Sequence, residues 1–86
     1  MNSLRKQFGL RILRIRHDLE KSQEDFAELM GMSVDFLSLI ERGRNAPSFE
    51  TLERMAAALR VPVAYLFTFD PKDLRVPKKR HALKRK

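Results

Sequence analysis

The segment Ser22–Gly43, SQEDFAELMGMSVDFLSLIERG, constrains the fold more than any other part of the chain. Its apolar residues recur at helical spacing on both sides of Gly31, which predicts two short helices joined by a tight turn. Ser22 can cap the first helix, and the second starts near Ser33. The inward-facing residues are predicted to be Phe26, Ala27 and Met30, with Leu29 flanking them, and then Leu37 and Ile40. Because Ala27 is small, the second helix can cross the first closely, as in a helix-turn-helix that places its second helix in the DNA major groove.

The remainder of the chain is also predicted to be helical. Leu4, Phe8, Ile12, Ile15 and Leu19 recur at three- and four-residue steps and form the apolar side of a first helix. The arginines and lysines of this helix (Arg5, Lys6, Arg11 and Arg14) are expected on its other sides. Ser48 can cap a helix over Phe49–Leu59, and Pro62 can open a short fifth helix over Val63–Phe67. No segment alternates as a strand would, so we predict an all-α, compact five-helix bundle that contains the helix-turn-helix.

The net charge of +7 is confined to the end of the chain. Residues 1–70 hold ten Lys or Arg and ten Asp or Glu, whereas residues 71–86 hold eight basic residues and one acidic residue. We therefore divide the chain into a DNA-binding domain, residues 1–70, and a basic C-terminal tail, residues 71–86. The tail is either a loose contact with phosphates or a solvated terminus.

Composition excludes several classes of function. The 86 residues contain no cysteine, so there is neither a disulfide framework nor a thiolate metal site. His17 and His81 are isolated histidines without partners at ligand spacing, and no Ser/His/Asp arrangement or pair of acids suggests catalysis. No apolar run reaches the length of a membrane span. We expect a cytoplasmic protein that is not an enzyme, binds no metal or cofactor and does not enter a membrane.

Five sequence blocks resemble the Cro/repressor-type (XRE) helix-turn-helix family. They are FGLRI within Phe8–Arg16, SQEDFAELMG at Ser22–Gly31, LIERGRNAPS at Leu39–Ser48, TLERMAAAL at Thr51–Leu59 and VPVAYLF at Val61–Phe67. Together they cover most of the chain in the order and spacing of the family. The resemblance implies a lambda-repressor-like bundle that binds operator DNA as a two-fold dimer.

The resemblance also implies a set of DNA-binding residues. Gln23 matches a phosphate donor at a helix N-terminus, Arg42 and Arg44 match phosphate contacts after the recognition helix, and the others match its base-facing side. The full set is Gln23, Ser33, Val34, Asp35, Ser38, Leu39, Arg42 and Arg44. Arg16 and Glu41 match a pair that ties the first helix to the third.

Two departures from the family pattern matter. The recognition helix has no Gln, Asn, Arg or Lys among its base-facing residues. Val34 and Leu39 could instead touch thymine methyl groups, and Asp35 could accept from cytosine N4, so phosphate contacts and DNA shape carry more of the specificity. Phe36 is expected to pack beneath the turn. The second departure is Glu20-Lys21, in the turn between the first two helices, where many members have a glycine and an apolar residue.

The C-terminal aromatic cluster predicts a partner surface. A homodimer is expected through Val63, Tyr65, Leu66 and Phe67, which exceed what so small a bundle can hide. The leading hypothesis is a sequence-specific transcriptional regulator of double-stranded DNA, a small repressor or controller-type protein. The alternative is a protein-interaction module, such as an antitoxin or a bridging factor, with limited base readout. Nonspecific nucleic-acid binding by the tail is a weaker third hypothesis, since no aromatic residues interleave its charges.

Overall fold

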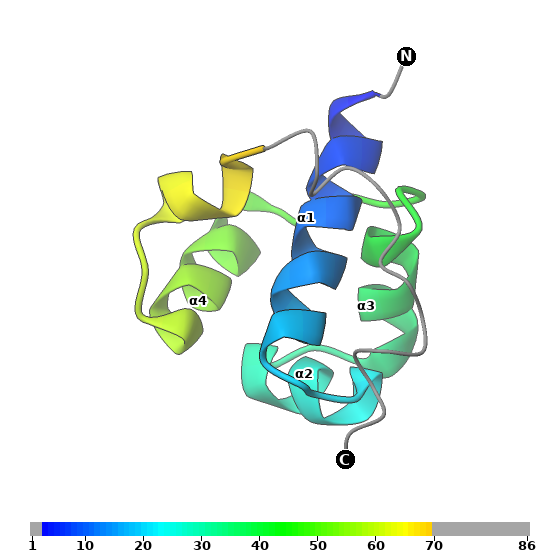
Figure 1. Cartoon of the computed structure of the whole chain (residues 1–86), viewed down its shortest axis with the longest axis vertical. Helices are drawn as coiled ribbons and strands as arrows, with labels where there is room; N and C mark the ends of the chain where they lie inside the picture. Colours follow the sequence, from blue (N-terminus) through cyan, green and yellow to red (C-terminus); the bar gives the residue numbers. More distant parts are fainter. Residues whose placement is uncertain (1–2, 70–86) are drawn as a thin grey trace.

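The computed structural model describes residues 3–69, which form four α-helices and one 3₁₀ element (Figure 1). The elements are α1 (Leu4–Asp18), α2 (Gln23–Met30), α3 (Val34–Glu41), α4 (Phe49–Leu59) and η1 (Val63–Phe67). The all-α prediction is confirmed for this part of the chain, but the fifth helix is a 3₁₀ element rather than an α-helix. Tyr65 N donates to the carbonyl of Pro62, three residues earlier, at 2.9 Å, which is the hydrogen bond of a 3₁₀ turn.

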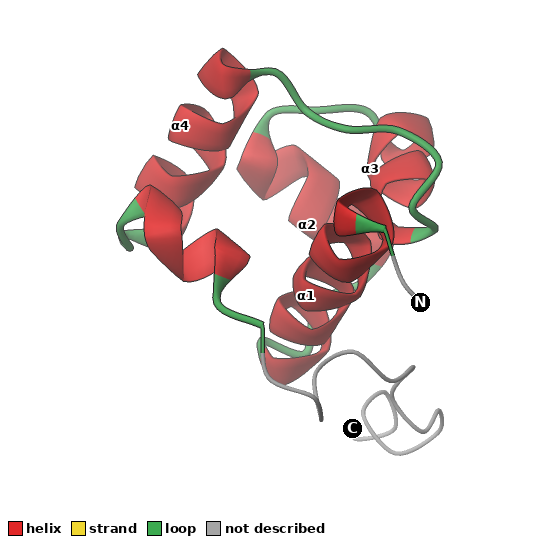
Figure 2. Ribbon diagram, turned by 90° about the horizontal axis from the view of Figure 1, so that it is seen from above, coloured by secondary structure: helices red, strands yellow, loops and turns green. Residues whose placement is uncertain are grey.

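The elements are arranged around α1, which runs through the middle of the molecule (Figure 1). Helix α3 packs on one side of α1, η1 packs on the other, and α4 packs against η1 and α2. Seen from above, α3 and α4 lie on opposite sides of the bundle (Figure 2). Helix α1 therefore lies between the predicted recognition helix, α3, and the surface that η1 forms.

The hydrophobic core draws on every element. The residues completely or almost completely removed from solvent are Phe8, Ile12, Ile15, Phe26, Ala27, Met30, Leu37, Ile40, Leu52, Met55, Ala56 and Leu66. The inward positions predicted for α2 and α3 are confirmed. Leu4 and Leu19, which the periodicity places on the apolar side of the first helix, are 61% and 46% exposed. They lie at or beyond the ends of α1, where no neighbouring element covers them.

Four serines begin the four α-helices. Each hydroxyl accepts a backbone N–H three residues further on, at 3.0–3.2 Å; the caps are Ser3, Ser22, Ser33 and Ser48. An N-cap serine contributes about 1 kcal/mol relative to alanine. The caps therefore fix where each helix starts, including both helices of the predicted helix-turn-helix.

All four α-helices also end in the same way. At each end one residue has a positive φ and its N–H donates back into the last turn. The N–H of the following residue bonds to the carbonyl one residue earlier, which is a Schellman motif. The four positive-φ residues are Glu20, Gly31, Gly43 and Arg60. Glycine adopts this conformation without strain, whereas Glu20 and Arg60 do not. The turn at Glu20-Lys21 therefore forms despite the departure from the family pattern, with Glu20 in the position that favours glycine.

Candidate nucleic-acid interface

Helices α2 and α3 form one capped unit that presents a single outward face. Gly31, with a φ of 75°, ends α2, and Ser33 then caps α3. Since Leu37 and Ile40 are fully buried, the opposite face of α3 carries the residues at one-turn spacing from Asp35. That face consists of Asp35, Ser38, Leu39 and Arg42, of which Asp35 and Arg42 are exposed and the other two half-buried.

A buried polar network fixes the position of α3 relative to α1. The Arg16 guanidinium donates from Nε to Glu41 Oε2 at 2.6 Å and from Nη2 to Glu41 Oε1 at 3.1 Å. Arg16 Nη1 also donates to the Lys21 carbonyl at 3.0 Å. The predicted Arg16–Glu41 pair is therefore confirmed as a two-pronged ion pair. Its geometry sets the angle between the helices, although a buried ion pair adds little net stability.

The same network orients Gln23, the first residue of α2. Gln23 Nε2 donates to Glu41 Oε1 at 2.9 Å, so the side chain is held against the end of α3. An amide nitrogen carries two hydrogens, and this contact uses one of them. The positive end of the α2 dipole lies at the same place. The arrangement is compatible with the phosphate contact predicted for Gln23, which stays a prediction.

Two exposed arginines follow the outward face of α3. Arg42 is the C-cap residue, and its Nε lies 3.4 Å from the Ser38 carbonyl. Gly43, with a φ of 72°, reverses the chain, and the Arg44 N–H then bonds to the Leu39 carbonyl at 2.9 Å. This turn keeps Arg42 and Arg44 beside the end of α3.

The structure separates the two apolar residues predicted to read bases. Val34 is half-buried and packs against the core, as does Phe36, whose predicted packing role is confirmed. Leu39 lies on the outward face with Asp35 and Ser38. Ser33 is exposed, and its hydroxyl accepts the Phe36 N–H as the cap of α3. Leu39 is consequently the better candidate for an apolar contact with DNA.

Two residues of α1 have structural roles that the sequence interpretation did not assign to them. Arg11, expected on an outer side, is buried and donates from Nε and Nη2 to the Tyr65 carbonyl at 3.2 and 3.1 Å. Its guanidinium also lies 4.4 Å from the centroid of the Tyr65 ring. The spacing Phe8, Arg11, Ile12, Ile15 places Arg11 within the apolar stripe, and this signal could have revealed it.

Gly9 is the second of these residues. A Cβ at this position would overlap the carbonyl oxygens of Ile40 and Glu41, so the backbone of α1 at Gly9 lies directly against the backbone at the end of α3. Only glycine permits this approach without moving α3. Because a lone glycine inside a helical pattern has several explanations, the sequence did not indicate the contact.

One residue of the predicted dimer surface is wrongly assigned. Leu66 has no exposed surface, because η1 closes the core over α1 and α4. Phe67 is half-buried, with its ring 4.9 Å from that of Phe8. Val63 and Tyr65 remain exposed at 37% and 42%. Any partner surface on η1 is therefore made by these residues and not by Leu66.

Two further observations concern the described residues. Within residues 3–69 there is no cluster of three or more His, Cys, Asp or Glu side chains arranged to hold a metal ion. In the same range, none of the helices combines the length and the apolar character needed to cross a membrane.

A capped two-helix unit with one free polar face and adjacent arginines defines a DNA-binding regulator of the helix-turn-helix class. The sequence profile of the helix-turn-helix family matches residues 10–66, and the chain belongs to this family, in its Cro/repressor (XRE) branch. It is accordingly a DNA-binding regulator and not an enzyme.

Several relatives carry names of regulators. An uncharacterised HTH-type transcriptional regulator of Sinorhizobium fredii is 37% identical over 65 residues, which cover 76% of this chain and 84% of that protein. The control protein C.MunI of a Mycoplasma species is 30% identical over 69 residues, covering 79% of this chain and 93% of the relative. The immunity repressor protein of Bacillus phage phi105 is 41% identical over 56 residues, covering 65% and 39%. No solved structure matches the chain significantly.

Proposed function

We propose that the protein is a small repressor or controller-type regulator that binds operator DNA as a homodimer, with α3 in the major groove. The observation that carries this proposal is the outward face of α3, which is held rigidly by the Arg16–Glu41–Gln23 network. A rigid base-reading face avoids the entropy cost of ordering side chains on binding. The names of the control protein and the immunity repressor support the same regulatory class. A protein that acts on operators works where the DNA is, in the cytoplasm.

The contacts divide into phosphate and base contacts. We assign phosphates to Gln23, Arg42 and Arg44, which gather at the C-terminal end of α3. Asp35 can accept from cytosine N4, and Leu39 can touch a thymine methyl group. Ser33 and Ser38 supply short hydroxyl contacts, and Val34 contributes chiefly by supporting α3. With so few direct readers, sequence-dependent DNA shape carries part of the specificity.

Operators are commonly bound by two-fold symmetric proteins, so we propose that this protein binds as a homodimer. Val63, Tyr65 and the exposed edge of Phe67 are the η1 residues available for a partner. Two symmetric recognition helices would contact half-sites about one helical turn of DNA apart. We therefore propose a palindromic operator.

Selection from random duplexes with the full chain tests the proposal. We expect a shared palindromic site, and we expect Asp35→Ala and Leu39→Ala to change the selected bases. Glu28→Ala, an exposed change on α2 away from the α3 face, is the matched control and should leave the site unchanged. Recovery of no shared sequence would contradict a sequence-specific regulator.

The alternative function is a protein-interaction module such as an antitoxin or bridging factor. The exposed apolar side chains Leu4 and Phe49, 61% and 81% accessible, favour some protein contact at the end of the molecule away from α2. Under this alternative, the selection would fail while the folded protein still bound a protein partner.

A further inference from the structure

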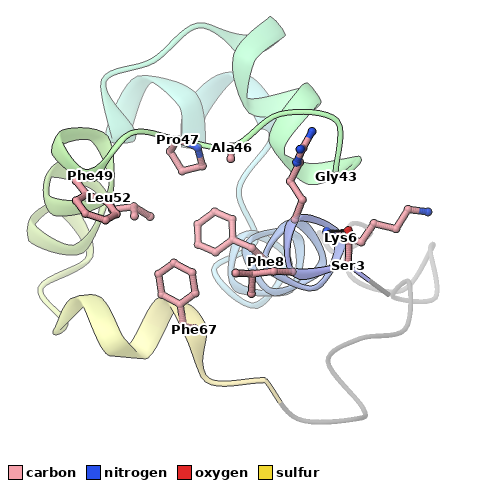
Figure 3. A pocket seen from close by; sticks show the side chains of 11 residues that line it. Ser3, Lys6, Phe8, Gly43, Ala46, Pro47, Phe49, Leu52 and Phe67 are labelled. Atoms are coloured by element: carbon pink, nitrogen blue, oxygen red, sulfur yellow. Dashed lines mark hydrogen bonds between the residues drawn. The ribbon is translucent and has the colours of Figure 1, made fainter. Parts of the chain in front are cut away.

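An apolar hollow opens between α1 and α4, next to the loop that follows α3 (Figure 3). Its volume is about 590 Å³. Figure 3 shows Lys6 and Phe8 of α1 on one side, Phe49 and Leu52 of α4 on the other, and Phe67 of η1 below. A second hollow of about 290 Å³ adjoins it and shares Phe49, Leu52 and Phe67. Phe49 thus stands between two hollows on one face.

Phe49 is the most exposed large apolar side chain of the described residues, at 81%. It occupies the first turn of α4, directly after the cap Ser48, and the hydrophobic core of the chain does not cover it. A protruding side chain beside a hollow on the same face suits a two-fold interface, because both subunits present an identical patch and each side chain can enter the other subunit's hollow. The hollow is large enough to receive one phenyl ring.

The charges around the hollow complement one another across such an axis. Arg5 and Lys6 line its α1 side. Glu53 lines the adjoining hollow on the α4 side, and Glu50 is in the same first turn of α4 as Phe49. All four side chains are exposed, and none is in an ion pair within the described part of the chain. A two-fold axis through this face would bring the basic edge of one subunit to the acidic edge of the other.

We propose that two copies of this chain pair through this face, with Phe49 of each copy seated in a hollow of the other. The proposal rests on the homodimer proposed above and specifies its interface. It selects Phe49 and Val63, which both line the smaller hollow, over Tyr65, whose ring already lies against Arg11. Because Gly43 and Ala46 also line the hollow, the contact fixes the separation of the two recognition helices.

Sedimentation of the full chain without DNA, across micromolar concentrations, measures the interface. We expect Phe49→Ser to raise the dimer dissociation constant about 100-fold, since two buried phenyl rings are lost. As Phe49 is exposed in the single chain, circular dichroism should show an unchanged fold. Leu29→Ser, on an exposed part of α2 outside both hollows, is the control and should still dimerise.

A charge swap tests the identity of the occupant. Lys6→Glu and Glu53→Lys should each weaken the dimer several-fold, and the double variant should restore it, because only a second copy presents both edges. A dimer that survives Phe49→Ser but is lost in Tyr65→Ser would overturn this interface while leaving the proposed homodimer intact. A protein that is monomeric at every concentration would overturn both. Loss of dimerisation without rescue by the double variant would contradict the symmetric pairing of charges.

Discussion

At the scale of single residues, His17 links folding to pH. Its Nδ1 is buried without a hydrogen-bond partner among the described residues. Burial lowers the pKa of His17 below its ordinary value of 6.5, and the neighbouring Arg16 guanidinium lowers it further, against a smaller opposing effect of Glu41. The folded state therefore binds a proton less readily than the unfolded state.

This difference predicts a loss of stability on mild acidification. Neutral His17 makes its full contribution to the free energy of unfolding above pH 6.5. The contribution declines as the pH falls from 6.5 through the lower folded-state pKa, because the unfolded chain takes up the proton first. His17→Gln should flatten the dependence of the urea midpoint on pH between 7.5 and about 5.5. An equally steep dependence in the variant would assign the effect to other groups.

Gln23 and Arg44 should affect DNA binding in different ways. Gln23→Ala and Arg44→Ala should each weaken binding while changing sequence preference little, because both are assigned to phosphates. Arg44→Ala removes a cation, so the slope of log K against log salt should become shallower by about 1. Gln23 is neutral, and its loss should leave the slope nearly unchanged. Salt titrations of gel shifts measure both, and a new selected sequence for Arg44→Ala would show that Arg44 reads bases.

At the scale of elements, the helix ends divide into relaxed and strained Schellman turns. Gly31 and Gly43 adopt positive φ without cost, whereas Arg60 holds a φ of 61° with a side chain. The Arg60 N–H donates to the Ala57 carbonyl at 3.1 Å, so this turn ends α4 just before the chain enters η1. The strain is retained because the flanking helix and η1 fix the turn.

Relief of this strain should stabilise the protein. Arg60→Gly should raise the free energy of unfolding by about 0.5–1 kcal/mol, since glycine relaxes the left-handed turn and loses part of the gain to unfolded-state entropy. Gly31→Ala is the opposite control and should destabilise, because its φ is 75° and its Cβ would meet the Arg54 side chain at 3.2 Å. Urea denaturation compares the two. If Arg60→Gly lowers the free energy of unfolding, the Arg60 side chain makes a contact that stabilises the fold by more than the strained turn destabilises it.

At the scale of the whole molecule, α1 is tied to α3 and to η1, which carry the proposed DNA and dimer surfaces, through two buried arginines. Arg16 holds Glu41 of α3, and Arg11 holds the Tyr65 carbonyl of η1. Arg11→Met keeps most of the side-chain volume but leaves that carbonyl without its charged donor. We expect a loss of about 1–3 kcal/mol in unfolding experiments. Arg44→Met, at an exposed position outside both hollows, is the control and should change stability by less than about 0.5 kcal/mol.

The basic tail, residues 71–86, lies outside the described residues, and its role stays a prediction. A chain that ends at Asp70 should remain folded, bind DNA less tightly and show a smaller salt slope, since eight basic residues are removed. The ratio of specific to nonspecific affinity should stay level or rise, because the lost contacts are sequence-blind. Equal affinities and slopes for the two chains on operator and random duplex would show that the tail does not touch DNA.

The sequence alone determined the features that depend on neighbours along the chain. The serine caps, the helical spacing of Phe26, Met30, Leu37 and Ile40, and the glycine turns are local, so the bounds of α4 and the helix-turn-helix followed directly from the residues. The Arg16–Glu41 pair joins distant elements, and it came only from resemblance to a family.

Tertiary structure decided the rest, because it depends on contacts between residues far apart in the chain. Leu66 is buried because η1 packs on α1 and α4, whereas Phe49 at the start of α4 stays exposed, and neither outcome is visible in apolar composition. Arg11 lies in the interior because the Tyr65 carbonyl, 54 positions away, satisfies its guanidinium. Gly9 is required because the end of α3 crosses α1 at that point. Periodicity predicts which side of a helix is apolar, whereas packing determines which part of that side is covered.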